Sequence, residues 1–480
     1  MTAAPSVTRT PASLTGAVPK PGRVLAVTTL GLALVLLNQS SVNVALPSMS
    51  GYFHAGAGTA DWFLLSFMIA TTASILVFGR ISDLIGRKPL YLTGLSVFAL
   101  ASAACVFAPN SLTFIVIRVL QGIAGAVVIT NSTALIADAF PADKLAGALG
   151  INLSAAAVAN TVGPAIGGVL VTAFDWQAVF LVNLPFGIAA VVLGIRILPN
   201  PRRAVSDGPR DRFDYFGAAL SALGLTALLF GVDRLSVADS SPVVVVVPLI
   251  AGVLLLAGFV VVETRVRHPL VDVALVKDWA RGCAYGAAFF NSFSRAGVTL
   301  LVVLHAQIVG GSSPAEAGLV VMVMAFAMSV ASPLAGRLAS RVPARTVSSV
   351  GGVLLVIGLV GLALLLDGPT WVTTVLLAVV GVGIGLFTTP NTTSIMSGVA
   401  PDRRAVANAV RSVLYNSAQA LGTTVSLLIV TVAGVASYAE NTGSGAVQTG
   451  FAVALGATAV SAALAVVLSI ARGGSWRTLD

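Results

Sequence analysis

Long apolar segments alternate with short polar or charged turns along almost all of the 480 residues. Each segment is close to the roughly 20 residues that a helix needs to cross a hydrocarbon core about 30 Å thick. The segments lack the alternation of barrel strands, and a helix satisfies its backbone polar groups internally. The pattern predicts an all-α integral membrane protein with 14 transmembrane helices, near residues 24–46, 61–80, 89–108, 111–137, 146–171, 178–198, 214–234, 243–263, 282–308, 315–337, 346–366, 370–394, 405–436 and 448–471.

The composition agrees with a chain that folds in lipid. Apolar residues make up 57% of it and charged residues only 9%, and the mean hydropathy is +0.97. So few charges cannot provide the water-facing surface of an ordinary soluble domain. Arg, Ala, Val and Gly are frequent while Lys is rare, which is typical of a GC-rich bacterial genome. We therefore expect a multi-pass protein of a bacterial cell membrane.

Basic residues concentrate in every second turn, and cytoplasmic loops are the ones that accumulate Lys and Arg. Among the Lys and Arg residues, only Arg234 lies in the opposite turns. This asymmetry places both termini in the cytoplasm, with residues 1–23 as a disordered tail. The net charge of +9 then faces anionic lipid, so a nucleic-acid partner is not implied. The basic residues of the cytoplasmic turns are Arg80, Arg87, Lys88, Lys144, Arg202, Arg203, Arg210, Arg212, Arg265, Arg267, Lys277, Arg337, Arg341, Arg345, Arg403 and Arg404.

Two short motifs recur at nearly one spacing. Gly79-Arg80 returns 257 residues later as Gly336-Arg337, and a Gly followed after five residues by an Asn, at 125 and 131, returns 260 residues later at 385 and 391. This offset covers eight predicted helices, so two six-helix halves must be separated by two additional helices. We predict two pseudo-symmetric six-helix bundles joined by a linker of two helices. The expected divisions are 24–200, 201–265 and 282–471.

Three motifs with special residue types occur in order. The turn after the second helix contains Gly79, Asp83, Gly86, Arg87 and Lys88; the fourth helix contains Arg118, Gln121, Gly122 and Gly125; the fifth contains Gly163, Pro164, Gly167 and Gly168. In this order they resemble the major facilitator superfamily, and specifically its 14-span drug:proton antiporter branch. The resemblance extends over residues 24 to 470.

The motifs suggest two conformational devices. A carboxylate near a helix N-terminus and a guanidinium can form charge-assisted bonds across a helix interface. Asp138 is expected at a depth where it can pair with Arg87 or with Arg80, so we predict, as the resemblance also implies, a latch that stabilises the outward-facing state. Its members are Gly79, Asp83, Gly86, Arg87, Lys88 and Asp138. In the fifth helix, Gly163, Pro164, Gly167 and Gly168 lack bulk and one backbone donor, which permits a bend where the bundles rock.

Charges at mid-membrane depth indicate the functional site, because they are costly there. The candidates are Arg118, Arg295 and, at shallower depth, Arg411. Asn38 lies about 12 Å below the outer edge at 1.5 Å per residue, and Arg118 reaches about the same depth. We expect these two side chains to bond each other or to share a ligand. The predicted substrate site also includes Gln121, Asn291 and Tyr415.

Proton coupling needs a group that titrates. The related branch usually has an acidic residue where this chain has Asn38, and an amide takes up no proton at physiological pH. None of the 18 Asp and Glu residues falls at the middle of a predicted helix. The titratable candidates near a cavity are Asp61, His305 and Asp138.

A cavity with central Arg and no central carboxylate attracts anions and repels lipophilic cations. We therefore predict a neutral or anionic substrate. The resemblance, with its fifth-helix motif and two extra helices, implies a monomeric exporter of a drug, antibiotic or metabolite that is coupled to proton influx. The alternative is a uniporter or anion exchanger without a central carboxylate. A membrane enzyme is disfavoured, because the short loops lack paired catalytic groups. No metal-ligand spacing or phosphate loop is present, so no cofactor is expected.

Overall fold

The computed structural model describes residues 21–198, 215–235, 241–266, 278–339, 341–396, 399, 404–435, 438 and 445–473. Residues 1–20 of the predicted tail (1–23) and residues 201–214 of the predicted linker lie outside these ranges, whereas residues 21–23 of the predicted tail belong to a helix. The described chain is helical: α1 (Pro21–Tyr52), α2 (Ala57–Ile85), α3 (Arg87–Val106), α4 (Ser111–Ala139), α5 (Ala142–Phe174), α6 (Gln177–Leu181), α7 (Asn183–Ile197), α8 (Tyr215–Arg234), α9 (Pro242–Glu263), α11 (Trp279–Ile308), α12 (Pro314–Ala339), α13 (Ala344–Leu365), α14 (Thr370–Met396), α15 (Arg404–Val432) and α16 (Gly445–Ala471).

The predicted all-α membrane fold is confirmed, but the number of spans is not. Within the described ranges, 12 helices are long and apolar enough to cross a bilayer, with α6 and α7 together forming one of them. The helices α2 and α8 are not among the 12. The apolar part of α8, Phe216–Val232, is only 17 residues long, which is shorter than the other apolar helices. A count of 14 spans therefore remains a prediction.

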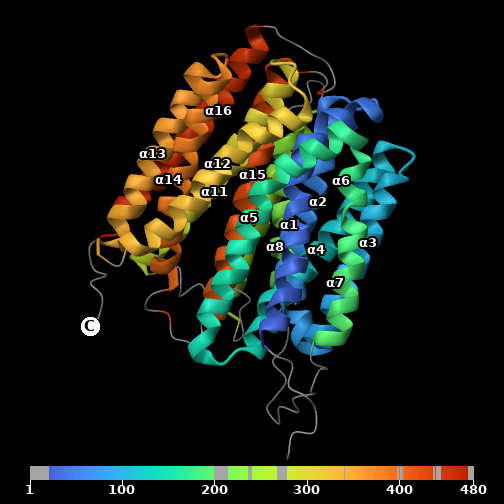
Figure 1. Cartoon of the computed structure of the whole chain (residues 1–480), viewed down its shortest axis with the longest axis vertical. Helices are drawn as coiled ribbons and strands as arrows, with labels where there is room; N and C mark the ends of the chain where they lie inside the picture. The colour runs from blue at the N-terminus through green and yellow to red at the C-terminus, as the bar shows by residue number, and fades with distance from the viewer. Residues whose placement is uncertain are drawn as a thin grey trace, which may run out of the picture.

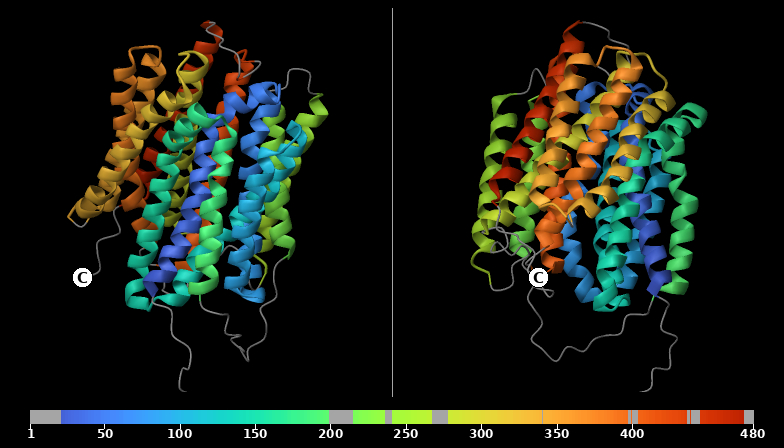
Figure 2. Two further views of the ribbon diagram at one scale, coloured as in Figure 1. Left: turned by 45° about the vertical axis from the view of Figure 1, so that its right-hand side comes forward. Right: turned by 60° about the vertical axis from the view of Figure 1, so that its left-hand side comes forward.

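The helices form two groups that lie side by side (Figure 1). In the first, which we call the N-terminal helices (α1–α7), α1 packs along α5 and α2 packs along α4. In the second, the C-terminal helices (α11–α16), α11 packs along α15 and α16, and α12 along α14. Figure 2 shows the two groups from two further directions. The interface between them is formed mainly by α5 with α12 and by α2 with α15.

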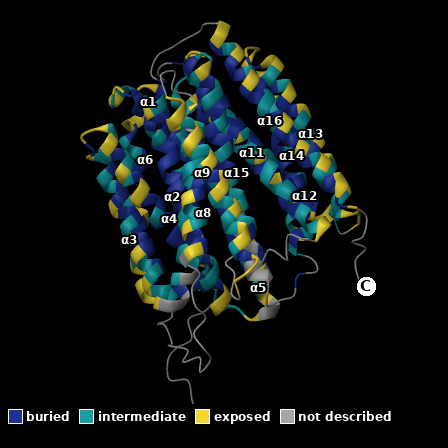
Figure 3. Ribbon diagram, turned by 180° about the vertical axis from the view of Figure 1, so that it is seen from behind, coloured by how far each residue is buried: buried dark blue, intermediate teal, exposed yellow. Residues whose placement is uncertain are grey.

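The helices α8 and α9 pack along each other and join the rest through α8, which contacts α2 and α15. Much of α9 is exposed, and valine and leucine side chains such as Val243, Val253 and Leu254 are on its surface. Exposed residues, drawn in yellow in Figure 3, also lie along the outer faces of both groups. Apolar side chains on such faces are what a lipid environment favours.

The sequence repeat has a counterpart in the packing. A Cβ atom on Gly122 of α4 would lie 2.5 Å from the carbonyl oxygen of Phe67 in α2. A Cβ atom on Gly381 of α14 would lie 2.1 Å from the carbonyl oxygen of Met324 in α12. The two glycines are 259 residues apart and the two contacted residues are 257 apart. The same close helix crossing, which only glycine permits, therefore occurs in both groups.

The helices α5 and α12 cross with their backbones in contact. A Cβ on Gly168 would lie 2.2 Å from the carbonyl oxygen of Pro314, and a Cβ on Gly318 would lie 2.3 Å from that of Pro164. From this crossing the two helices diverge toward their other ends (Figure 1). We call the end of the molecule where α5 ends and α12 begins the closed end.

Candidate functional site

A hollow of about 700 Å³, including space open to solvent, lies between the two groups of helices. It begins at the α5–α12 crossing, where Pro164 is part of its wall, and extends away from the closed end. The polar side chains of the wall include Gln39, Asn43, Arg118, Asn160, Arg295 and Gln419, and its apolar part includes Leu64, Met68, Val321, Met324 and Met328. No carboxylate is among the described residues of this wall. We call this hollow the central cavity.

Arg118 is anchored at the wall of the central cavity by three helices. Its side chain is only 1% exposed. The Nε atom donates to the carbonyl oxygen of Phe63 at 3.0 Å, and Nη1 donates to Gln121 Oε1 at 2.6 Å and to Asn38 Oδ1 at 3.3 Å. The guanidinium also lies 4.4 Å from the centre of the Phe67 ring. The predicted contact between Asn38 and Arg118 is therefore present in this structure.

Arg295 reaches the same cavity from the C-terminal helices and is held more loosely. Its Nη2 atom donates to the Tyr415 hydroxyl, and its guanidinium lies 5.4 Å from the centre of that ring. Arg295 comes 257 residues after Asn38, at the offset of the repeat. The position that holds an amide in α1 thus holds a guanidinium in α11. The cavity therefore has one cationic side chain from each group of helices.

Several buried amide groups near the cavity lack an acceptor. Asn38 Nδ2, Asn291 Nδ2 and Gln419 Nε2 have no hydrogen-bond partner among the described residues. Gln419 is part of the cavity wall and is 6% exposed. Because an unsatisfied buried donor is costly, a ligand with acceptor oxygens would be favoured here. Carboxylate, phenolate and carbonyl groups all fit this requirement.

Three hydrogen bonds between described residues join the two groups of helices at the closed end. The Tyr438 hydroxyl donates to Asp61 Oδ1 at 2.6 Å. Gln307 Nε2 donates to the carbonyl oxygen of Val44 at 3.2 Å. The backbone N–H of Ala315 donates to Thr172 Oγ1 at 3.1 Å. Breaking the closed end apart would expose all of these groups.

The motif of the fifth helix uses two adjacent faces. On one face, Ser41 of α1 donates to the carbonyl oxygen of Gly163 at 2.7 Å, and a Cβ on Gly167 would lie 2.8 Å from Ser41. On the other face, Pro164 and Gly168 contact α12 at the crossing. The helix α5 continues through Pro164 from Ala142 to Phe174. The motif therefore brings α5 into close contact with both groups of helices.

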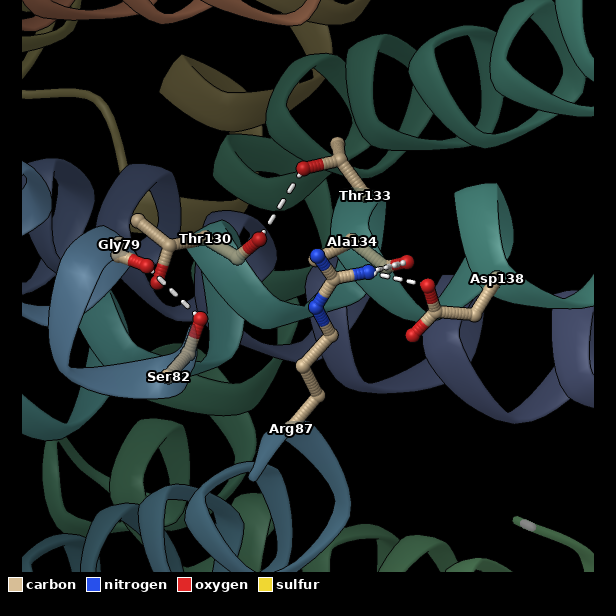
Figure 4. A network of polar contacts seen from close by, with 7 residues as sticks. All are labelled: Gly79, Ser82, Arg87, Thr130, Thr133, Ala134 and Asp138. Atoms are coloured by element: carbon tan, nitrogen blue, oxygen red, sulfur yellow. Dashed lines mark hydrogen bonds and ion pairs between the residues drawn. The ribbon is translucent and has the colours of Figure 1, made fainter. Parts of the chain in front are cut away.

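The charged turn between α2 and α3 is tied to α4. Arg87 Nη1 forms an ion pair with Asp138 and donates to the carbonyl oxygen of Ala134 at 3.1 Å (Figure 4). Ser82 Oγ donates to the carbonyl oxygen of Gly79 at 2.8 Å. These contacts lie within the N-terminal helices.

The rest of this turn fixes the start of α3. Gly86 has φ 106°, a conformation that favours glycine, and it connects α2 to α3 directly. Lys88 Nζ donates to the carbonyl oxygen of Leu198 at 2.7 Å and so caps the end of α7. The side chain of Asp83 lies outside the described part of the chain, so its predicted part in the latch has no structural description.

Some predicted site residues lie elsewhere. His305 Nε2 lies 2.9 Å from Asp367 and is not part of the described cavity wall. The reason is distance along α11, because residue 305 is about three turns beyond Arg295. Asp138 lies near the end of α4 and pairs with Arg87 of the charged turn, and Asn291 is buried without lining the cavity. Asp61 is likewise absent from the wall, so none of the three titratable residues expected near the cavity lines it among the described residues.

Sequence reasoning missed other residues. Tyr438 follows α15 in a connection without periodicity, so nothing in its surroundings indicated that it bonds to α2. Asn160 and Thr161 both line the cavity from α5. These two polar residues interrupt an apolar segment and could have been recognised by that interruption.

The family model of the Major Facilitator Superfamily matches residues 28–266 and 284–478. The chain is 29% identical over 403 residues to the riboflavin transporter RibZ of Clostridioides difficile (strain 630), covering 83% of this chain and 86% of the relative. It is 31% identical over 407 residues to the multidrug resistance protein Stp of Mycobacterium tuberculosis (strain CDC 1551 / Oshkosh), covering 85% and 74%. The fold is similar, with a TM-score of 0.65 and 14% identity over 95% and 98% of the two chains, to a bacterial homolog of the human lysosomal transporter Spinster in an inward-facing and unoccupied conformation.

Proposed function

The chain belongs to the Major Facilitator Superfamily and is a transporter rather than an enzyme. We propose that it exports a drug, an antibiotic or another small organic metabolite by alternating access. The observation that carries the proposal is the central cavity, whose wall is shared by both groups of helices and which ends at the α5–α12 crossing. A site between two repeated halves is the usual arrangement in secondary transporters. The name of Stp, a multidrug resistance protein, supports the direction of transport.

The proposed topology has 14 spans, with α2 and α8 completing the 12 that meet the criteria of length and hydropathy. The two bundles cover 24–200 and 282–471, and α8 and α9 belong to the linker 201–265. Both termini are cytoplasmic in a bacterial cell membrane, and the protein functions as a monomer. This orientation is supported by the basic residues of the turns. The closed end then faces the outside, and the cavity faces the cytoplasm.

Export requires the closed end to open while the opposite end closes. Pro164 and Gly168 allow α5 to pivot against α12 with no side chain between the two backbones. The ion pair between Arg87 and Asp138 lies at the cytoplasmic end, and this described contact joins two of the N-terminal helices. As a latch, it would meet the C-terminal helices once that end closes, and would stabilise the outward-facing state.

The substrate is a neutral or anionic organic compound with acceptor oxygens. The support for this comes from Arg118, Arg295 and the unpartnered amide of Gln419, which all face a cavity with no described carboxylate. A cation would meet two guanidinium groups there without a compensating charge. Riboflavin, the compound in the name of RibZ, is a suitable neutral probe.

We propose that proton influx drives the export. The second candidate is a uniporter or anion exchanger, and it is favoured by Asn38, which cannot titrate at the position bonded to Arg118. The two candidates differ in their energy source and can be separated by imposing a pH gradient.

The full chain in proteoliposomes tests these proposals. We expect accumulation of fluorescein, an organic anion, or of riboflavin when a pH gradient is imposed, and much weaker transport of the cation ethidium. Liposomes without protein, and liposomes with the Arg118→Gln variant, serve as controls. Counterflow that ignores the pH gradient would favour the uniporter or exchanger. Absence of both gradient-driven transport and counterflow for the anion and the neutral probe would refute the proposed function.

A further inference from the structure

The apolar wall of the central cavity is built from two copies of one pattern. Leu64 and Met68 of α2 line the cavity. Val321 and Ala325 of α12, which follow these two residues by 257 positions, line it as well. Because 257 is the offset of the sequence repeat, the apolar lining comes in two matching halves, one from each group of helices.

The amide side chains of the wall follow the same repeat. Asn160 of α5 and Gln419 of α15 both line the cavity, and they are 259 residues apart. Packing supports this alignment of α5 with α15. A Cβ atom on Gly163 would lie closer than 3.0 Å to α1, and a Cβ atom on Gly422, again 259 residues later, would lie closer than 3.0 Å to α11. Each group of helices therefore contributes one amide to the cavity from the same place in its repeat.

The two cations of the cavity stand at matching places although they come from different helices. Arg295 of α11 occupies the position that corresponds to Asn38 of α1. Arg118 extends from α4 and donates to Asn38 Oδ1 at 3.3 Å, so its guanidinium lies beside that position in the N-terminal helices. The counterpart of Arg118 in α14, 259 residues later, is the buried and apolar Leu377. The N-terminal helices thus supply from α4 the charge that the C-terminal helices supply from α11.

The described partners of both guanidinium groups are neutral. Arg118 donates to a backbone carbonyl oxygen and to two side-chain amides, and Arg295 donates to the Tyr415 hydroxyl. The positive charge of each group is therefore available to a ligand from its own side of the cavity. A ligand with a single anionic group compensates one of these charges and leaves the other uncompensated.

We propose, building on the proposed exporter, that the cavity recognises compounds with two acceptor groups at opposite ends of an apolar core, which we call two-ended compounds. Carboxylate, phenolate and sulfonate groups are suitable ends. One end binds Arg118 and the amide of Asn160, and the other end binds Arg295 and the amide of Gln419. The core lies on the matching apolar residues of α2 and α12. Such a compound bridges the two groups of helices, whereas a compound with one acceptor group is held by one of them.

This mode of binding connects recognition to export. A ligand that both groups of helices hold favours the states in which these groups lie close together around it. A ligand held by one group has no such differential effect. We therefore expect two-ended compounds to be transported faster than one-ended compounds of the same core.

Binding of matched aromatic acids to the full chain in lipid nanodiscs tests the inference. Terephthalate, naphthalene-2,6-dicarboxylate and biphenyl-4,4′-dicarboxylate have carboxylates at opposite ends, with three different spacings. Each is compared with the acid that lacks the second carboxylate, and with the isomer that has both carboxylates on adjacent carbons. We expect at least one two-ended acid to bind about tenfold or more tightly than both of its controls, as measured by isothermal titration calorimetry.

Variants on both sides of the cavity identify the two ends. We expect Asn160→Leu on one side, and Arg295→Met or Gln419→Leu on the other, to bring the affinity ratio of the two-ended acid to its monocarboxylate close to one. Binding of the monocarboxylate, which the intact end retains, shows that each variant is folded. Arg341→Met removes an exposed basic residue beyond α12 and should keep the full preference.

The inference is overturned if no two-ended acid binds more tightly than its controls, or if the variants of only one group of helices change the preference. Fluorescein counterflow separates this result from the proposed function. If the unchanged protein transports fluorescein but has no preference for two-ended acids, the inference fails while the exporter stands. If it has the preference but transports neither fluorescein nor riboflavin, the proposed function fails while the two-ended site stands.

Discussion

Gly318 of α12 lies against the carbonyl group of Pro164 in α5, so closely that a Cβ atom at residue 318 would be 2.3 Å from the carbonyl oxygen. Gly168 of α5 has the same relation to Pro314 of α12, at 2.2 Å. Real Cβ atoms essentially never come within 3.0 Å of another heavy atom, and backbone cannot move aside as a side chain can. The closed end therefore requires glycine at both positions.

Gly318→Val should prevent the closed end from closing. Overpacking typically costs about 1–3 kcal/mol, which is roughly a 5- to 150-fold change in the ratio of closed to open molecules. We expect the distance between spin labels on Phe174→Cys and Ser312→Cys, at the closed end, to lengthen and export to fall in proportion. Gly150→Val is the control, because a Cβ on Gly150 of α5 would meet nothing within 4 Å. Equal distances in the two variants would contradict this prediction.

Asn38→Asp should add a central acid beside Arg118. The new carboxylate would occupy the position from which Asn38 Oδ1 accepts at 3.3 Å, and would compensate part of the positive charge of the cavity. We expect stronger pH dependence of transport or broader recognition of cations, measured with ethidium and fluorescein from pH 6 to pH 8. Gln39→Glu puts an acid in the cavity wall next to this position and shows whether the contact with Arg118 matters. An unaltered profile in Asn38→Asp would mean that residue 38 does not influence the transport pathway.

Replacing Arg118 should destabilise the protein more than replacing Arg295, whereas both replacements should slow transport. Arg118→Met removes three buried hydrogen bonds and leaves their acceptors unsatisfied, so we expect the free energy of unfolding to fall by about 2–4 kcal/mol. Arg295→Met removes one half-buried bond to Tyr415 and should cost about 1 kcal/mol. Both variants should transport fluorescein more slowly. Thermal melting in detergent measures the loss of stability in each variant. A greater loss in Arg295→Met than in Arg118→Met would contradict this prediction.

Arg472 should stabilise the C-terminal helices from just beyond α16. It is 3% exposed, and it donates to Asn391 Oδ1 at 2.9 Å and to Ser348 Oγ at 3.3 Å. We expect Arg472→Met to lower the free energy of unfolding by about 1–3 kcal/mol. Arg341→Met, at an exposed basic residue, is the matched control and should have almost no effect. Melting temperatures of the two variants provide the comparison.

The stability supplied by Arg472 should not depend on pH near neutrality. Burial, together with the nearby Arg345, lowers the pKa of Arg472 from the ordinary value of arginine to about 10. The guanidinium is protonated in both the folded and the unfolded chain well below that value, so its contribution is constant between pH 6 and pH 8. Only above about pH 10, and up to the ordinary pKa of arginine, does the unfolded chain bind more protons, and there this group makes stability rise with pH. A difference between Arg472→Met and the unchanged protein that varies from pH 6 to pH 8 would contradict this assignment.

Much of the site could be anticipated from depth along the helices. Asn38 and Arg118 were expected at one depth, and the structure joins them by a hydrogen bond. His305 illustrates the limit of that reasoning, because its distance along α11 places it beside Asp367 and beyond the cavity wall. Depth is a coordinate along one helix, whereas lining a cavity also depends on how that helix is rotated and which neighbours it meets.

The sequence by itself determined that this chain is an all-α membrane protein, that its basic residues concentrate in every second turn, and that short motifs recur after about 257 residues. These properties follow from local chemistry, since lipid requires apolar helices with internally bonded backbone. The tertiary structure alone decided that Gly318 meets Pro164, that Tyr438 bonds to Asp61, and that the central cavity has donors without a described carboxylate. Each of these joins segments far apart in the chain, and their meeting depends on the packing of whole helices, which no local pattern of residues specifies.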